Sequence, residues 1–382
     1  MKITKRCFHS ENKKNIIILY RNRNAKQRFH HTIQEEFSIK KLGVAVISCS
    51  VMAQVHMQAV MDNPNTELAM LCDLNETLLH EAAEKFGVEK TTVDYRDVLN
   101  DPEIDAVIIV TPDQTHKEIT LAALAAKKHV LCEKPMALKL DECSEMIAAA
   151  KAAETKMMVG QICRYTPGFV EAKKLIDRGE IGELFFVETE YAHDYSKIGL
   201  PWRLDPLRHG FLGGGCHAVD LARWIAGDPT EVFAYANHKM LPNYPTDDCT
   251  IAIMKFPNNV IGKVFVSTGC KRNYTMRSVF YGTKGTIITD NTSNHMTVFK
   301  DGVGNGETLF ADLPQSHAIP IEYPVIVNNH NAAGELDEFV DCIVNDKPIH
   351  TTAVEGAKTV KASLAAVESS KTGMPVKIEY DF

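Results

Sequence analysis

The chain lacks the features that mark membrane proteins, metal sites and disulfide-rich scaffolds. Its longest wholly apolar runs, such as residues 106–110, fall far short of the ~20 residues that span a bilayer. The ten cysteines include no C-x-x-C pair and no Cys/His set at zinc-ligand spacing, which predicts no metal and buried thiols in a reducing cytosol. The formal net charge of -7 gives no indication of a nucleic-acid partner. We therefore expect a soluble, cytoplasmic protein without a membrane or nucleic-acid partner.

The first forty residues differ in composition from the rest of the chain. They hold ten Lys and Arg against three Asp and Glu, and one short apolar run at residues 16–20. A secretory signal peptide needs a longer apolar region and a small-residue cleavage site. We predict that residues 1–40 form a disordered extension, or upstream sequence included by a wrong start codon. A DNA-binding arm is the alternative.

A chain of 382 residues exceeds one ordinary core, so we expect two domains after the extension. From residue 42 onward, short apolar runs alternate with stretches of helical period. The expected strands are residues 44–47, 66–73, 106–110, 129–135 and 156–161, and the expected helices are residues 52–61, 75–87, 115–128 and 140–154. This alternation predicts a doubly wound, parallel Rossmann sheet over residues 41–162, with right-handed crossovers.

Residues 163–382 follow a different pattern. Two expected helices, at 166–179 and 217–227, precede strands at 231–239, 249–257, 260–269, 277–290 and 295–301, and helices return at 334–346 and 353–373. Apolar and polar residues alternate in residues 260–265, which indicates an antiparallel sheet with one exposed face. We predict an α+β domain with an open, mostly antiparallel sheet for substrate binding and oligomerisation, whose C-terminal helices can pack back on the first domain.

The first strand and helix lack the glycines of the dinucleotide-binding turn. In G-x-G-x-x-G or G-x-G-x-x-A, the glycines allow a tight turn and a close approach of the pyrophosphate. The matching positions here are Ser48, Ser50 and Ala53. Serine fits if its φ stays negative, and otherwise costs about 1–2 kcal/mol per residue. The backbone N–H groups at the start of the expected helix, at Val51 and Met52, still point at the phosphates. We therefore predict that cofactor binding survives, weakened or with the cofactor slightly shifted.

Further candidate cofactor contacts follow the strand ends, where ligands bind in this fold. Asp73 ends the second strand, 25 residues after Ser48, where an acid usually binds the adenosine ribose and favours NAD over NADP. A helix cap is the alternative for this side chain. A lysine between a glutamate and a proline at a strand end is a better candidate for a functional amine than an isolated loop lysine. The candidates after the third and fourth strands are Thr111, Pro112, His116, Glu133 and Lys134.

Several stretches resemble the Gfo/Idh/MocA oxidoreductases, the family of glucose-fructose oxidoreductase and inositol dehydrogenase. They include V-L-C-E-K-P-M-A-L at 130–138, G-G-G-C-H-A-V-D at 213–220 and the C-terminal residues 335–378. The resemblance covers about residues 42 to 380. It implies a Rossmann domain followed by an open-faced β-sheet domain, with NAD near Lys134 and the substrate between the domains.

The resemblance also implies which residues carry the chemistry. His217 is similar to the family's acid/base histidine, and Lys134 would hydrogen-bond the reacting hydroxyl and assist proton transfer. A histidine with an ordinary pKa of ~6.5 can accept that proton near neutrality, while a nearby ammonium favours the developing alkoxide. Asp220 is expected on the same helix face as His217, where it could orient the ring. Some members carry an aspartate where Gly213 stands here, which points to a subgroup of the family.

Candidate substrate contacts come from residues 164–169 and 193–210, with packing between the domains as the alternative. Aromatic faces stack on sugar C–H groups, and arginine donates several hydrogen bonds at once. The candidates are Arg164, Tyr165, His193, Tyr195, Trp202, Arg203 and His209, together with His217.

We expect an NAD-dependent oxidoreductase that acts on a secondary alcohol of a sugar, of a glycoside at ring carbon three, or of a cyclitol. Its partners are the small-molecule substrate and further copies of the chain, in a homodimer or homotetramer formed through the second domain's sheet. Two alternatives remain open. One is an NAD-dependent glycosidase of the same family, and the other is a sensor or scaffold that has lost cofactor binding.

Overall fold

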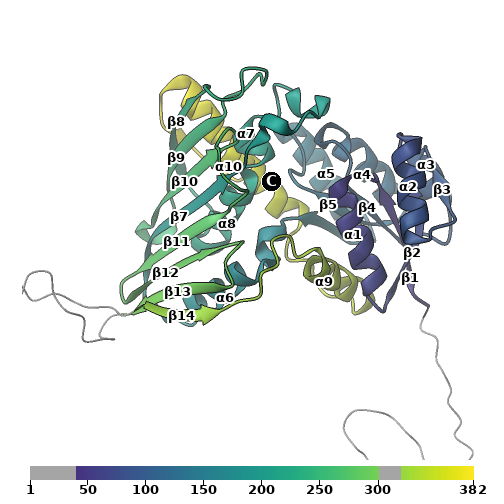
Figure 1. Ribbon diagram of the computed structural model, residues 1–382, viewed down its shortest axis with the longest axis horizontal. Coiled ribbons are helices and arrows are strands. Elements are labelled where there is room, and N and C mark those ends of the chain that lie inside the picture. Colours follow the sequence, from purple (N-terminus) through teal and green to yellow (C-terminus); the bar gives the residue numbers. More distant parts are fainter. Residues whose placement is uncertain (1–39, 301–319) are drawn as a thin grey trace, which may run out of the picture. The chain divides into compact units, whose positions relative to one another are not determined.

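The computed structural model describes residues 40–300 and 320–382, which form two β-sheets with helices packed on them (Figure 1). The predicted extension lies outside the described residues, apart from Lys40. Within the described ranges, no helix has both the length and the hydropathy needed to cross a membrane. All nine cysteines of these ranges are free thiols.

The first sheet is the predicted parallel sheet, and its strand order is β3-β2-β1-β4-β5-β6. This is the order of a doubly wound dinucleotide-binding fold. The strands are β1 (Leu42–Ile47), β2 (Thr66–Cys72), β3 (Thr91–Thr92), β4 (Ala106–Ile109), β5 (His129–Glu133) and β6 (Met157–Gly160). Helices cover both faces of the sheet, so β1, β4, β5 and the edge strand β6 are almost wholly buried, which explains the apolar runs within them.

The connecting helices agree with the prediction except at one edge. They are α1 (Val51–Asp62), α2 (Glu76–Phe86), α3 (Tyr95–Asn100), α4 (His116–Ala125) and α5 (Leu140–Ala152). The prediction of five strands was wrong by one, and it also omitted α3. Strand β3 has two residues and α3 has six, so neither is long enough to establish a period in the sequence.

The second sheet has nine strands in the order β14-β13-β12-β11-β7-β10-β9-β8-β15. They are β7 (Leu184–Ala192), β8 (Glu231–Asn237), β9 (Cys249–Lys255), β10 (Ile261–Ser267), β11 (Arg277–Gly282), β12 (Gly285–Asp290), β13 (His295–Lys300), β14 (Pro320–Pro324) and β15 (Val376–Lys377). Strands β7, β14 and β15 were not predicted from the sequence. Strand β7 lies in the middle of the sheet, parallel to β10 and antiparallel to β11, so the sheet is mostly antiparallel, as predicted.

The helices after residue 166 either cover one face of the second sheet or pack against the first domain. They are α6 (Pro167–Asp177), α7 (Gly210–Gly213), α8 (Cys216–Ala226), α9 (Ala332–Val344) and α10 (Ala353–Thr372). Figure 1 shows α8 and α10 on the face of the second sheet that looks toward the parallel sheet. Helix α10 contributes Ala357 to the core of the parallel sheet and Ala366 to the core of the second sheet. Helix α9 packs against α1.

Short 3-10 helices complete the chain between these elements. They are η1 (Asp113–Thr115), η2 (Ile162–Tyr165), η3 (Tyr195–Lys197), η4 (Pro201–Leu204) and η5 (Pro257–Asn259). Four of them, η1 to η4, lie in the segments that leave the strands β4, β6 and β7 at their carboxyl ends. The carboxyl ends of β4 and β6 belong to the edge at which an open α/β sheet binds its ligands.

Candidate active site

Lys134 and His217 line one pocket, although they come from different domains. Lys134 follows directly after the buried strand β5, and the Lys134–Pro135 peptide bond is cis. His217 lies in the first turn of α8 and is 5% exposed. The carboxyl end of a parallel strand therefore meets the start of a helix from the second domain, and an ammonium and an imidazole share the space between them.

Glu133 anchors the segment that carries Lys134. Its Oε1 lies 3.0 Å from Nε2 of His56 in α1, and its Oε2 accepts a hydrogen bond from the Lys134 backbone N–H at 2.9 Å. Burial would raise the pKa of Glu133, but the hydrogen bond and charge of His56 outweigh it and lower the pKa to about 2. The carboxylate is thus held inside the protein, and the structure does not give it the predicted cofactor contact.

The imidazole of His217 is kept neutral by its surroundings. Burial lowers its pKa well below the ordinary value, and the charges of Lys134 and His330 lower it further. Its ring lies between two others, with ring centroids 5.9 Å from Tyr191 and 6.0 Å from His330. At neutral pH the ring is therefore unprotonated, the state that a proton acceptor requires.

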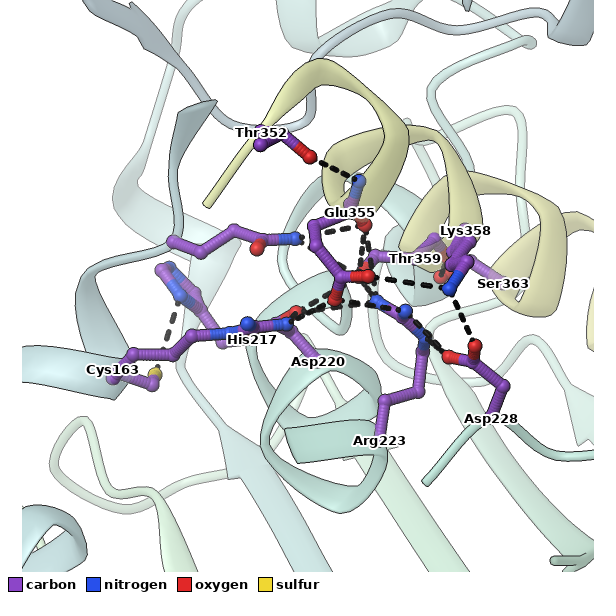
Figure 2. Close-up of polar contacts among 12 residues, drawn as sticks. Cys163, His217, Asp220, Arg223, Asp228, Thr352, Glu355, Lys358, Thr359 and Ser363 are labelled. Atoms are coloured by element: carbon purple, nitrogen blue, oxygen red, sulfur yellow. Dashed lines mark hydrogen bonds and ion pairs between the residues drawn. The ribbon is translucent and has the colours of Figure 1, made fainter. Parts of the chain in front are cut away.

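Asp220 lines the same pocket as His217, but its carboxylate binds other groups, contrary to our expectation that it orients the ring. Its Oδ2 and Oδ1 accept hydrogen bonds from Nε and Nη2 of Arg164 at 2.9 and 2.8 Å. The Thr359 hydroxyl donates a third hydrogen bond to Asp220, at 2.9 Å (Figure 2). Arg164 also lies 3.0 Å from Glu355 in α10. The pair therefore ties α8 to α10, and Arg164 does not face the pocket as a substrate ligand.

The neighbour of His217 on its Nδ1 side is a thiol. Sγ of Cys163 lies 3.5 Å from this nitrogen, as Figure 2 shows. Cys163 belongs to η2, directly after β6, and the next two residues of the same turn face other surroundings. Arg164 reaches Asp220, while Tyr165 packs beside α9, where burial and then Glu335 raise its pKa. A 3-10 turn spreads three consecutive side chains around its axis, so only the first of these reaches the pocket.

A wall of aromatic rings faces His217 from the second sheet. The Tyr191 hydroxyl lies 2.9 Å from that of Tyr195 and 3.2 Å from Nδ1 of His193. The Tyr274 hydroxyl lies 3.1 Å from Nε2 of His330. His193 and Tyr195 were predicted as substrate contacts, and they lie in this wall. The hydroxyls and ring nitrogens present donors and acceptors suited to a polyhydroxylated ligand.

Arginine side chains lie against the Tyr195 side of this wall. The guanidinium of Arg203 lies 4.9 Å from the ring centroid of Tyr195 and 5.0 Å from that of Trp202. Burial would raise the pKa of Tyr195, but the cations of Arg208 and Arg203 outweigh it and lower the pKa. The Gln114 side chain of the first domain donates a hydrogen bond to the Trp202 carbonyl at 3.0 Å. The predicted contacts Trp202 and Arg203 therefore lie where the two domains meet.

His209 lies outside this group. Its Nδ1 accepts the Phe211 backbone N–H at 3.1 Å and caps α7, and its Nε2 lies 3.5 Å from Asp247. The side chain is buried, with its polar atoms directed at protein groups. We therefore assign His209 to the support of α7, and the prediction that it holds a sugar hydroxyl is not supported by its position.

The turn between β1 and α1 has serines at the two positions where the dinucleotide-binding motif has glycines, and their backbone angles differ. Ser50 has φ -61°, which any residue adopts, but Ser48 has φ 116°. The Ser48 hydroxyl accepts the Ser50 backbone N–H at 3.2 Å. Within the described residues, the first turn of α1 carries no acidic residue and no side-chain cap, and Val51 is 84% exposed. The end of the helix thus keeps free amides that fit a phosphate, at the cost of strain at one serine.

Asp73 bridges this turn to the next one. Its Oδ2 accepts the Cys49 backbone N–H at 2.6 Å, and its Oδ1 accepts the Asn75 backbone N–H at 2.8 Å. The cap of α2 is the Asn75 side chain, so the alternative that we gave for Asp73 does not describe it. The carboxylate is partly exposed, and its remaining lone pairs fit the hydroxyls of a ribose.

Of the predicted contacts after β4, Thr111 and Pro112 are partly exposed but His116 is not. Both ring nitrogens of His116 face carbonyl groups, Nδ1 that of Pro135 at 2.9 Å and Nε2 that of Thr111 at 3.0 Å. Burial would lower the pKa of His116, but Cys132, Asp113 and the Pro135 carbonyl raise it to about 9. A doubly protonated ring ties the two loops together, and it has no nitrogen left for the predicted cofactor contact.

The sequence analysis missed several residues of this site. They are Cys163, Tyr191, Tyr274, Met276 and His330. Cys163 follows the end of β6, so the rule that ligands bind beyond strand ends would have found it. Tyr191 lies on β7, one of the strands that were not predicted. His330 precedes α9 and belongs to no motif, so nothing in the sequence alone would have found it.

The chain matches two family models. Residues 42–161 match the model described as "Oxidoreductase family, NAD-binding Rossmann fold", and residues 169–288 match the model described as "GFO/IDH/MocA C-terminal domain". Together they span more than half of the sequence.

Curated relatives and solved structures are similar over most of the chain. The myo-inositol 2-dehydrogenase of Thermotoga maritima is 27% identical over 345 residues, which is 88% of this chain and 98% of that protein. The levoglucosan dehydrogenase of Pseudarthrobacter phenanthrenivorans is 31% identical over 249 residues, 57% of this chain and 64% of that protein. A crystal structure of an oxidoreductase domain protein from Kribbella flavida has a TM-score of 0.80 at 26% identity, covering 89% of this chain and all of that one.

Proposed function

Because this chain belongs to the Gfo/Idh/MocA family of NAD-binding oxidoreductases, we propose that it moves a hydride between NAD and a secondary alcohol of a sugar, a glycoside or a cyclitol. The observation that carries the proposal is the pocket shared by Lys134 and a neutral His217. An alcohol can lose hydride only as its hydroxyl proton leaves, and these two side chains offer a base and a stabilising cation for that step.

The residues of the site have different roles in the proposed reaction. His217 accepts the hydroxyl proton, and the Lys134 ammonium stabilises the negative charge that develops on the same oxygen. NAD, when bound, accepts the hydride and returns it in the reverse direction. The wall of Tyr191, His193, Tyr195 and Tyr274 orients the ring of the substrate.

The cofactor would be held along the carboxyl ends of β1, β2 and β4. The backbone amides at Val51 and Met52 fit the pyrophosphate, and Thr111 and Pro112 lie at the next strand end. Asp73 fits the adenosine ribose and would repel a phosphate on its 2′ hydroxyl, so NAD is favoured over NADP.

Polyhydroxylated rings are the proposed substrate class, with oxidation of a glycoside at ring carbon three as the preferred case. The relatives named above are dehydrogenases of myo-inositol and levoglucosan, which supports this class for the present chain. The test is a panel of methyl glycosides, inositols and levoglucosan with NAD, followed by the absorbance of NADH. At least one member should be oxidised, and Lys134→Ala and His217→Ala should each lower kcat by about 10²–10⁴-fold while NADH still binds.

The same panel separates the alternatives. Hydrolysis of a glycoside without accumulation of NADH would favour an NAD-dependent glycosidase. If NADH up to millimolar concentration leaves the fluorescence of Trp202 and Trp224 unchanged, the protein is a sensor or scaffold and the proposed activity fails. Normal turnover in both variants would remove Lys134 and His217 from the mechanism.

A cytoplasmic homodimer or homotetramer formed through the second sheet is also proposed. The strands β8, β9 and β10 expose apolar side chains on the face that the helices leave open, among them Tyr235, Ile253 and Ile261. Exposed apolar side chains grouped on one sheet face mark an interaction surface. Light scattering should give a multiple of the chain mass, and Ile253→Asp should shift it toward the monomer.

A further inference from the structure

We propose that Cys163, backed by Met276, holds His217 in the tautomer that carries its proton on Nδ1, and that Cys163 is therefore a positioning residue for proton transfer. The inference rests on the proposed function, because it specifies how His217 becomes a base. It starts from an unusual feature of the site. A carboxylate or carbonyl commonly fixes the tautomer of a functional histidine, but Nδ1 of His217 faces a thiol at 3.5 Å (Figure 2).

The direction of the thiol proton follows from its second neighbour. Sγ of Cys163 lies 3.3 Å from Sδ of Met276, and a thioether sulfur can only accept a hydrogen bond. A thiol has one proton, and we assign it to the contact with Met276, because the imidazole can donate a hydrogen of its own to the thiol whereas the thioether cannot. The sulfur then turns a lone pair toward His217, and the Nδ1 of that ring must supply the hydrogen. Nε2 is left with a free lone pair.

Asp220, on the same helix as His217, does not take this role. Its carboxylate accepts hydrogen bonds from Arg164, Arg223 and Thr359, and none joins it to His217. A buried carboxylate on Nδ1 would favour the imidazolium and raise the pKa of the ring. A neutral thiol orients the ring without that effect. Burial also raises the pKa of the Cys163 thiol well above its ordinary value, so the group stays protonated.

The tautomer decides which reaction His217 can assist. With Nδ1–H bonded to Cys163, Nε2 takes the hydroxyl proton of the alcohol while the hydride leaves the carbon of the same C–O group for NAD. The product is a ketone, and the ring becomes an imidazolium with hydrogens on both nitrogens. The opposite tautomer has its proton on Nε2 already and cannot accept the substrate proton there.

The test reads the tautomer directly. Protein with ring-¹⁵N-labelled histidine is examined by long-range ¹H–¹⁵N correlation at pH 7.5, and His217 is assigned from the signal missing in His217→Gln. Wild-type protein should show a protonated Nδ1 and an unprotonated Nε2. A protonated Nε2 in the wild type would overturn the proposal, and this outcome does not depend on any variant folding.

Variants of Cys163 extend the test to activity. Cys163→Ser keeps a donor and an acceptor, so it should keep the tautomer and at least a third of kcat. Cys163→Ala should shift the ring toward the Nε2-protonated form and lower kcat at least tenfold, with KM changed less than threefold. Cys143→Ala removes another fully buried thiol, in the core of the parallel sheet, and should leave the His217 spectrum unchanged.

The outcomes separate this inference from the proposed function. Turnover of a ring alcohol by a protein whose His217 carries its proton on Nε2 would remove the role of Cys163 and leave the activity standing. The Nδ1-protonated tautomer in a protein that oxidises no member of the panel would support the tautomer and remove the activity. An unchanged tautomer and kcat in Cys163→Ala would overturn the inference.

Discussion

The carboxylate of Asp113 and the guanidinium of Arg208 form a buried ion pair that joins the two domains beside the active site. Nε of Arg208 lies 2.6 Å from Oδ2 of Asp113, and the two side chains are 3% and 4% exposed. Asp113 begins η1 after β4, whereas Arg208 comes from the segment before α7. The pair thus joins the proposed cofactor domain to the segment before α7, beside the proposed substrate site.

Breaking this pair should destabilise the protein strongly. Asp113→Ala leaves the Arg208 charge buried without its partner, and such a change costs about 3–5 kcal/mol of the free energy of unfolding. The control is Glu154→Ala, which removes an exposed pair with Lys127 and should cost less than about 1 kcal/mol. Urea denaturation measures both variants. A cost below 1 kcal/mol for Asp113→Ala would show that the pair does not hold the domains.

Restoring the aspartate that some family members carry at position 213 should not improve this enzyme. A Cβ added at Gly213 would lie 2.4 Å from Nη1 of Arg208, which its pair with Asp113 keeps in place. We expect Gly213→Asp to lose about 1–3 kcal/mol of stability through overpacking, together with activity. Gly199→Ala is the control, because nothing lies within 4 Å of its added Cβ. Higher kcat in Gly213→Asp with unchanged stability would contradict this account.

Ser48→Gly should strengthen NADH binding. Ser48 has φ 116°, and its hydroxyl accepts the Ser50 N–H that would otherwise face the phosphates. Glycine removes the acceptor and frees this donor for a phosphate oxygen, and a hydrogen bond to a charged group contributes about 1.5–3 kcal/mol, so Kd should fall at least tenfold. The strain of about 1–2 kcal/mol at Ser48 is present with and without NADH, so its relief raises the free energy of unfolding instead.

The matched control is Ser50→Gly at the other substituted position. Ser50 already has φ -61°, so glycine relieves no strain there. Calorimetric titration with NADH compares both variants with the wild type. Equal effects of the two substitutions, or weaker binding by Ser48→Gly, would show that the Ser48 hydroxyl does not limit affinity.

The stability that Glu335→Gln gains over the wild type should be larger at neutral pH than at pH 5. Glu335 is fully buried, and burial, then Glu133 and Glu338, raise its pKa well above the ordinary value. The unfolded chain releases this proton near pH 4.3, roughly its ordinary pKa, while the folded protein keeps it. The wild type therefore loses up to about 1.4 kcal/mol per pH unit above that value, a loss that glutamine avoids.

Urea denaturation of wild type and Glu335→Gln at pH 5.0, 6.0 and 7.0 checks this prediction. Glu84→Gln, an exposed position in α2, is the control and should show no such trend. A difference between Glu335→Gln and the wild type that does not grow with pH would mean that the folded protein ionises Glu335 as readily as the unfolded chain.

The pH dependence of alcohol oxidation should reflect the lowered pKa of His217. Burial, Lys134 and His330 keep the ring neutral below its ordinary pKa of about 6.5. The acid limb of kcat/KM should therefore have its midpoint below pH 6.5, and activity should be flat from there to neutrality. A midpoint at or above pH 7 would show that another group, or an imidazolium, governs the step.

Much of the architecture could be predicted from the sequence. Strands β1 and β4 are apolar throughout and β5 is apolar at its centre because both of their faces are buried, and this pattern is local. The same pattern places Asp73 and Lys134 at strand ends, and parallel strands bring those ends to one edge of the sheet. The resemblance to known oxidoreductases then pointed to His217, which the structure brings into the same pocket as Lys134.

The partners of the charged and tautomeric groups were decided only by the tertiary structure. Asp220 lies three residues from His217, yet it binds Arg164 and Thr359. His330 and Met276 reach the site from segments that carry no motif. Spacing along a helix tells which groups share a face. It does not tell which of several donors a buried carboxylate or imidazole meets, because burial makes that choice depend on every element packed around it.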